Sequence, residues 1–162
     1  MSDYALEDVS VVMGSYNEEE AIGPVLEDIE DATDGEAEVV VVDGSSDGTA
    51  EIARDHGATV IEQEPQGYGY AVCKALLSAS NPVRITTDCD GTYPMERIPD
   101  FLELINEGYD VVSGDRLYHG AETMPTMNRF GNYAFAGLSS VLACDHMHDV
   151  TTGMRAYHED VI

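Results

Sequence analysis

Short apolar runs of strand type alternate along this 162-residue chain with segments whose apolar residues recur at helical spacing. Residues 39–42 are four consecutive valines, a composition typical of a strand that is covered on both faces of a sheet. Strands that alternate with helices in this way predict a parallel α/β sheet. The predicted strands are residues 9–13, 39–42, 59–61, 83–87 and 111–113, and the predicted helices are residues 19–32, 49–56, 66–79, 98–106 and 128–142.

The negative charge of the chain disfavours anionic partners. There are 32 acidic and 7 basic residues, for a net charge of −25. Such a field disfavours nucleic acid or an anionic membrane as a nonspecific partner. The acids are spread over predicted helix faces, as in residues 27–36, which favours the surface of a protein adapted to high salt. An acidic patch that binds a partner is the alternative.

Length and cysteine content indicate a single domain over residues 1–162, without disulfides. No uninterrupted apolar run of the length of a membrane span occurs, and the acidic N-terminus lacks a signal-peptide core, so we expect a cytoplasmic location. Cys73, Cys89 and Cys144 are odd in number and widely spaced, which fits neither a disulfide framework nor a zinc site. His146 and His148 have no evident third ligand, so a metal role is disfavoured.

Three polar stretches each follow a predicted strand, and open α/β sheets bind ligands at that carboxyl edge. They are Ser15-Tyr16-Asn17-Glu18, then Val42 to Thr49, then Thr87-Asp88-Cys89-Asp90-Gly91. In this order, with the last containing Asp-x-Asp, they resemble the family 2 glycosyltransferases of the GT-A fold. The resemblance is greatest to the branch that makes polyprenyl-phosphate sugars, the dolichol-phosphate mannose synthase type, and it covers about residues 9–158.

The resemblance implies an inverting glycosyltransferase that moves a sugar from a nucleoside-diphosphate sugar to a polyprenyl (dolichyl) phosphate. It implies a nucleotide-binding half at about residues 8–94 and an acceptor-side half at about residues 95–162. A lipid-linked acceptor implies peripheral contact with the inner face of the cell membrane. Relatives of this type usually continue with another helix and strands, so we expect either a C-terminal truncation or an unusually short form. The sequence leaves the donor nucleotide, the sugar and the formation of a homo-oligomer open.

Asp88 and Asp90 are the candidate metal ligands, with Asp88 also a candidate for contact with the donor. Carboxylates at positions i and i+2 after a strand suit Mg²⁺ or Mn²⁺, which prefer oxygen ligands and bridge diphosphates. In the family such a cation assists departure of the nucleoside diphosphate, which makes Asp90 a candidate catalytic residue. The alternative is a solvated acidic turn, common by chance in so acidic a chain.

The first two loops supply candidates for nucleotide-sugar binding. The resemblance implies this role for Tyr16, Asn17 and Glu18, although acids also suit the start of a helix. It implies contact with base or ribose for Asp43, with Ser45 as a further candidate. The chain departs from the family pattern in two places, because Gly14 replaces a proline and Val42 replaces an acid. Asp47 and Thr49 are expected to be structural, the first in a turn and the second as the cap or the opening residue of a helix.

Gly67 and Gly69 open a predicted helix, so backbone N–H groups there are candidates for phosphate or sugar contact. Relatives usually carry a lysine between these glycines, but here the residue is Tyr68. Lys74, farther along the same helix, is a candidate substitute. A plain glycine turn is the alternative.

Three of the six arginines, Arg116, Arg129 and Arg155, follow the last predicted strand, and arginine binds phosphate through two parallel hydrogen bonds. The resemblance places Arg116 and Arg129 at the acceptor phosphate and donor diphosphate, as catalytic and acceptor-binding residues, and Arg155 on the acceptor side. Ion pairing with the abundant carboxylates is the alternative. Asp149 is the candidate general base if the acceptor is a hydroxyl; a phosphate acceptor is already anionic and needs none.

Two rival functions remain open at the level of sequence. One is transfer to a hydroxyl acceptor, and the other is a nucleotide-binding module that does not catalyse. The glycine motif of dinucleotide-binding oxidoreductases, the P-loop and the nucleophile elbow of α/β-hydrolases are absent from the sequence. A nucleotidyltransferase is disfavoured, because the glycine-rich, arginine-containing loop after the first strand is also missing.

Overall fold

The computed structural model describes residues 3–115 and 152–162. The chain divides into two compact units, Met1–Val112 with Met154–Ile162, and Ser113–Gly153. The fold described here is that of the first unit. Several predictions lie outside the described residues: the helix at 128–142, the roles of Arg116, Arg129 and Asp149, and the predictions for Cys144, His146 and His148.

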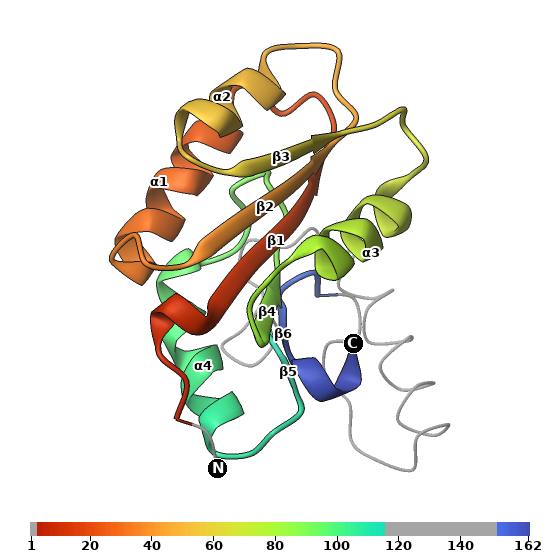
Figure 1. Ribbon diagram of the computed structural model, residues 1–162. Helices are drawn as coiled ribbons and strands as arrows, with labels where there is room; N and C mark the ends of the chain where they lie inside the picture. Colours follow the sequence, from red (N-terminus) through yellow and green to blue (C-terminus); the bar gives the residue numbers. More distant parts are fainter. Residues whose placement is uncertain (1–2, 116–151) are drawn as a thin grey trace, which may run out of the picture. The chain divides into compact units, whose positions relative to one another are not determined.

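Within the described residues, the sheet has six strands in the order β3-β2-β1-β4-β6-β5 (Figure 1). Neighbouring strands are parallel from β3 through β2 and β1 to β4. This architecture confirms the predicted mostly parallel α/β fold, and all five predicted strands are present. The strands are β1 (Val9–Ser15), β2 (Glu38–Asp43), β3 (Thr59–Glu62), β4 (Val83–Thr86), β5 (Val111–Ser113) and β6 (Arg155–His158).

The direction of chain progression across the sheet reverses beside β1. The chain moves from β1 to β2 and β3 on one side, then returns to place β4 on the other side of β1. The carboxyl ends of β1 and β4 therefore flank a topological switch point, the place where open α/β sheets bind ligands. The loop after β1 and the Asp-x-Asp loop after β4 lie on either side of it.

Helices cover both faces of the sheet, as the continuous apolar runs predicted. Core residues of β1 alternate: Val11 and Met13 pack with α1, α2 and α4, whereas Val12 packs with α3 on the other face (Figure 1). The helices are α1 (Ile22–Thr33), α2 (Thr49–Asp55), α3 (Tyr68–Ser78) and α4 (Ile98–Asn106), with short 3₁₀ turns η1 (Leu6–Asp8), η2 (Met95–Arg97) and η3 (Glu159–Val161).

Strand β6 was not predicted. It runs antiparallel to β4 and inserts between β4 and β5, with Arg155 opposite Thr86 and His158 opposite Val83. The four residues Arg-Ala-Tyr-His carry no β-branched side chain, so local composition gives little strand signal. Pairing with a strand some seventy residues earlier supplies the missing stabilisation, and it places the start of β6 beside the carboxyl end of β4.

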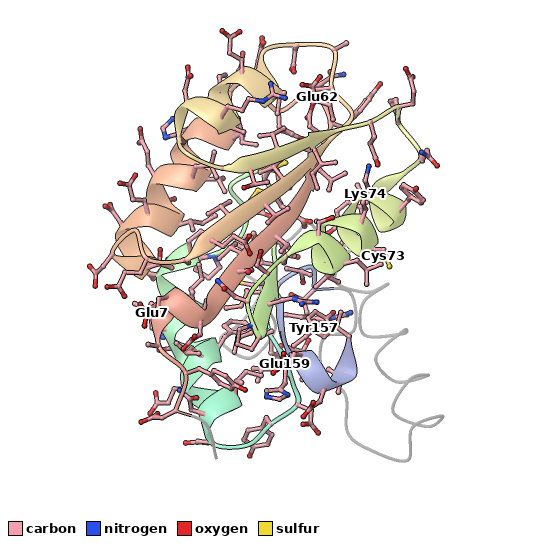
Figure 2. All side chains as sticks on the ribbon, in the orientation of Figure 1. Glu7, Glu62, Cys73, Lys74, Tyr157 and Glu159 are labelled. Atoms are coloured by element: carbon pink, nitrogen blue, oxygen red, sulfur yellow. The ribbon has the colours of Figure 1, made fainter. Side chains whose placement is uncertain are left out.

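The outward face of α1 bears much of the negative charge. Glu27, Asp28, Glu30 and Asp31 are all exposed, and Figure 2 shows oxygen-tipped side chains projecting from this helix away from the sheet. The described acids of α1 are thus a solvated helix face, as the charge pattern indicated. Within the described residues, no helix is both long and apolar enough to span a bilayer.

Gly14, which stands where the family pattern has proline, lies where α3 crosses β1. A Cβ built on Gly14 would come within 2.8 Å of the Ala71 Cβ. We expect Gly14→Ala to lower the free energy of unfolding by about 1–3 kcal/mol, because neither a strand backbone nor a helix backbone can yield cheaply. Denaturant unfolding in molar KCl measures the effect.

The compensating change tests this explanation. Ala71→Gly removes the opposing methyl group at a cost of about 1 kcal/mol for glycine in a helix. The double variant should therefore be more stable than the sum of the two single losses predicts, by an interaction free energy of at least about 0.5 kcal/mol. Gly69→Ala is the control, since nothing lies within 4 Å of a Cβ there. Strict additivity of Gly14→Ala and Ala71→Gly would contradict the proposed contact.

Candidate functional site

The loops after β1, β2 and β4 begin at one edge of the sheet. Backbone pairing continues to this edge, with Gly44 N–H donating to the Ser15 carbonyl at 3.1 Å and Thr87 N–H donating to the Val12 carbonyl at 3.1 Å. Because β1 lies between β2 and β4, its loop adjoins both others. The structure thus brings the three predicted motifs to a common edge.

Asp43 is the most buried acid of this edge, with 2% of its surface exposed. Its Oδ1 accepts hydrogen bonds from the hydroxyls of Ser15 and Ser45, each at 2.6 Å, and its Oδ2 accepts one from the Ser45 N–H at 3.1 Å. In β1–β2 register Ser15 lies directly opposite Asp43. The carboxylate therefore organises the loop from within, which is a different contribution from the predicted contact with base or ribose.

Asn17 and Ser45 join the first loop to the second. Asn17 N–H donates to Ser45 Oγ at 2.7 Å, and Asn17 Oδ1 accepts from Ser46 N–H at 3.0 Å. Asn17 has a φ of 56°, the left-handed conformation that asparagine tolerates better than most residues. Tyr16 beside it is 60% exposed, so its ring is available to a ligand.

Thr49 opens α2, which is one of the two positions predicted for it. It is the first residue of the helix, and the cap position is Gly48, which makes no side-chain cap hydrogen bond. The Thr49 hydroxyl oxygen instead accepts a hydrogen bond from Glu18 N–H at 2.9 Å. Asp47 does bond its own turn: the Thr49 hydroxyl donates to Asp47 Oδ1, as does the Thr49 N–H at 3.0 Å. The bond from the hydroxyl is the main cause that lowers the pKa of Asp47, and the bond from the N–H lowers it further. Both residues are structural, but Thr49 holds the neighbouring loop and does not cap its own helix.

The Asp88-Cys89-Asp90 segment is held at each residue by a different partner. Asp88 Oδ1 accepts a hydrogen bond from the Tyr68 hydroxyl, and the Cys89 thiol donates to the Gly14 carbonyl at 3.4 Å. Asp90 Oδ1 accepts from the Thr92 N–H at 3.0 Å and from the Thr92 hydroxyl at 2.6 Å. These contacts define the conformation of the loop.

Negative charge gathers around Cys89. Burial raises the pKa of the Cys89 thiol to about 12, with further increases from the carboxylates of Glu18, Asp88 and Asp90. Glu18, from the first loop, therefore acts on the same point as the two aspartates of the third loop. Three such carboxylates would repel an anionic diphosphate, and a cation between them would relieve that repulsion.

The two aspartates fit a divalent cation of the Mg²⁺ or Mn²⁺ type. One oxygen of each carboxylate is engaged by protein, and within residues 3–115 and 152–162 the second oxygen of each has no protein donor. No third acid, histidine or cysteine of the described residues joins them in a metal-binding group. Mg²⁺ typically takes one or two carboxylates and completes its coordination with water and substrate phosphates, which matches this arrangement.

The glycine turn opens α3 as predicted. Gly67 has a φ of 96°, which accounts for glycine there, whereas Gly69 faces open space. Lys74 Nζ donates to Gln63 Oε1 at 2.9 Å, which directs this cation to the strand end before the turn; Figure 2 labels Lys74 on α3. The proposed substitution of Lys74 for the family lysine therefore gains no support.

Arg155 is the described cation nearest in the sheet to the Asp-x-Asp loop. The β4–β6 register sets it opposite Thr86, two residues before Asp88. Its neighbours Met154 and Ala156 face the core shared with α1 and α4, so strand alternation directs Arg155 to the face covered by α3. Other described arginines are engaged elsewhere, with Arg54 paired to Glu62 and Arg97 to Asp100.

Sequence reasoning missed three residues that shape this site. Ser15 had no signal of its own, because its role depends on the register that sets it opposite Asp43. Tyr68 was noted only as a departure from the family pattern, and Thr92 was not singled out. An Asp followed two residues later by Thr is a turn signal that could have identified Thr92.

The fold and this edge define the class of a GT-A type nucleotide-sugar transferase, in which a mostly parallel sheet presents acidic loops at its switch point. The chain belongs to that class by sequence as well: it is a member of Glycosyl transferase family 2, whose profile matches residues 10–162.

Individual relatives support the assignment. The chain is 64% identical over 162 residues to a Dolichyl-phosphate hexose transferase of Haloferax volcanii, covering all of this chain and 71% of that protein. It is 37% identical over 154 residues to Glycosyltransferase AglJ of the same organism, covering 92% of this chain and 50% of the relative. Among solved structures, the chain is similar to glucosyl-3-phosphoglycerate synthase from Mycobacterium tuberculosis, with a TM-score of 0.69 and 25% identity over 94% of this chain. That structure is a complex with Mn²⁺, UDP-glucose and phosphoglyceric acid. The chain spans 57% of that solved protein.

Proposed function

We propose that this chain transfers a hexose from a nucleoside-diphosphate sugar to dolichyl phosphate, with inversion at the anomeric carbon. An oxygen of the acceptor phosphate attacks that carbon, the bond from carbon to the diphosphate breaks, and the nucleoside diphosphate leaves. The observation that carries the proposal is the acidic loop at the switch point in a chain 64% identical to a Dolichyl-phosphate hexose transferase.

The donor is proposed to bind along the first two loops. Exposed Tyr16 offers a ring face, Asn17 and Ser45 present polar groups beside it, and buried Asp43 holds this loop pair in place. The amide groups at Gly67 and Gly69 are candidates for donor contact at the start of α3. The three hydrogen bonds on Asp43 preorganise the donor site, so little ordering remains to be done on binding.

Asp88 and Asp90 are proposed to hold a divalent cation, Mg²⁺ or Mn²⁺, against the donor diphosphate. When bound, the cation would neutralise charge on the leaving diphosphate. We propose a cation here because the three carboxylates around Cys89 would otherwise repel the donor diphosphate. A Mn²⁺ complex of the solved relative at 25% identity supports the choice of metal class.

Acceptor binding is assigned to Arg116, Arg129 and Arg155. Arg155 has structural support from its place opposite Thr86 at the carboxyl edge. Arg116, Arg129 and Asp149 lie outside the described residues, and their roles stay as the family resemblance implies. Because dolichyl phosphate is a lipid, the proposal includes peripheral contact with the inner face of the cell membrane.

A soluble acceptor is the second candidate, favoured by the solved relative whose complex contains phosphoglyceric acid. The two acceptors differ in their need for a base. A hydroxyl must lose a proton on attack, and Asp149 is the candidate to take it, whereas a phosphate oxygen is already anionic. Asp149→Asn should therefore nearly abolish transfer to a hydroxyl and spare much of the transfer to a phosphate.

The direct test is a transfer assay in molar KCl with Mn²⁺ and detergent-dispersed dolichyl phosphate. UDP-, GDP- and dTDP-hexoses labelled in the sugar are supplied in turn, and label is measured in the organic-soluble lipid product. We expect one donor class to label the lipid, and EDTA to stop it. Nucleotide binding by calorimetry without any transfer would instead indicate a non-catalytic nucleotide-binding module.

A further inference from the structure

Tyr68 links the first turn of α3 to the acidic loop after β4. It is the first residue of the helix, directly after Gly67 in the left-handed region, and its hydroxyl donates to Asp88 Oδ1. The side chain is large and 55% of the residue is exposed, so it contributes little to the apolar core. Its position is explained by the polar contact with Asp88 and not by burial.

This contact differs in kind from the other two that hold the loop. Cys89 is bonded to the Gly14 carbonyl at the end of the adjacent strand, and Asp90 is bonded within its own turn by Thr92. Both arise from the sheet or from the loop itself. The donor to Asp88 comes from α3, the helix that precedes β4 in the chain, so this contact persists only while α3 and β4 keep their relative placement.

We propose that Tyr68 is a positioning residue for the divalent-cation site, orienting the Asp88 carboxylate by holding one of its oxygens and leaving the other for the cation. The inference rests on the proposed function, in which Asp88 and Asp90 are the ligands. A carboxylate ligand that accepts a hydrogen bond from a neighbouring group is confined to one orientation before the cation arrives. Without the phenol hydroxyl, Asp88 would have to lose rotational freedom at the moment of binding.

The consequence is a change in cation affinity. Loss of such an orienting partner typically weakens metal binding about 10–100-fold. We therefore expect Tyr68→Phe, which removes one oxygen and keeps the ring, to weaken Mn²⁺ binding by about tenfold or more. The opposite possibility has a distinct signature: if the hydroxyl competed with the cation for Asp88, Tyr68→Phe would bind Mn²⁺ more tightly.

The experiment measures free Mn²⁺ by electron paramagnetic resonance, in molar KCl, for wild type and Tyr68→Phe. Bound Mn²⁺ is the difference between total and free Mn²⁺. Titrations are made with Mn²⁺ alone and with Mn²⁺ plus UDP or GDP. Tyr70→Phe is the matched control, because Tyr70 lies in the same helix turn and is 50% exposed. The double variant Asp88→Asn with Asp90→Asn gives the binding due to the remaining surface acids, which is subtracted.

The outcomes separate this inference from the proposed function. The positioning role is supported if Tyr68→Phe binds Mn²⁺ more weakly than wild type, Tyr70→Phe binds it as wild type does, and the two variants have the same midpoint of thermal unfolding. If Tyr68→Phe binds Mn²⁺ as tightly as wild type or more tightly, and the double aspartate variant binds less than both, the role of Tyr68 is overturned and the cation site stands. Wild type that binds no more Mn²⁺ than the double variant overturns both the cation site and the inference.

Discussion

Asp90→Asn should remove cation-dependent nucleotide binding and lower sugar transfer by about a thousandfold. A bound cation contributes several kcal/mol to stabilising the charge of the leaving group, and each 1.36 kcal/mol is tenfold in rate. Asparagine keeps the side-chain oxygen that accepts from Thr92 N–H and from the Thr92 hydroxyl, so the turn should survive. The change therefore isolates the charge of Asp90 from its structural contact.

Calorimetry of UDP, GDP and dTDP binding, each with and without Mn²⁺, measures the first effect, and initial rates of transfer measure the second. Asp100→Asn is the matched control: it neutralises an exposed aspartate of α4 whose partner is Arg97. We expect the control to retain both properties within about twofold, because exposed ion pairs contribute little. Mn²⁺-dependent binding that persists in Asp90→Asn would contradict the assignment of the cation to this loop.

Asp43→Ala should cause the largest loss of stability among single changes at the site. The substitution removes a carboxylate that accepts three hydrogen bonds in a buried position, from two hydroxyls and one N–H. Hydrogen bonds to charged groups contribute about 1.5–3 kcal/mol each, and the abandoned donors carry their own desolvation penalty. We expect the free energy of unfolding to fall by about 3 kcal/mol or more, as measured by denaturant titration in molar KCl.

The same change should weaken donor binding beyond its effect on folding, because Ser45 accepts from Asn17 N–H while bonded to Asp43. Ser46→Ala is the control, since Ser46 Oγ makes only a 3.5 Å exposed contact with Asn17 Oδ1; it should change stability by less than about 0.5 kcal/mol. Ser15→Ala, which deletes one of the three donors, should fall between them. Equal stability of Asp43→Ala and Ser46→Ala would show that the buried carboxylate does not organise the loops.

The family and the sheet edge that carries the site could be predicted from the sequence, because both depend on patterns that extend over only a few residues. Parallel strands that carry an apolar residue on both faces are recognisable in short windows, as in the four valines that end at Asp43. Once the strands are parallel, their carboxyl ends must meet at one edge, and the loops at Asn17, Asp43 and Asp88 follow. Strand β6 escaped because its four residues have no comparable local pattern and acquire strand geometry only through pairing with β4.

The alternation of apolar runs with helical segments by itself determined the α/β class, the order of the elements from β1 to β5 and the polar residues that reach the carboxyl edge. The tertiary structure alone decided which of those residues touch: Ser15 with Asp43 through strand register, Tyr68 with Asp88 through the placement of α3, and Arg155 beside β4 through an antiparallel insertion. The physical reason is one of range. Periodicity and propensity act over a few residues, whereas each of these contacts joins segments at least 20 residues apart and depends on the packing of whole elements.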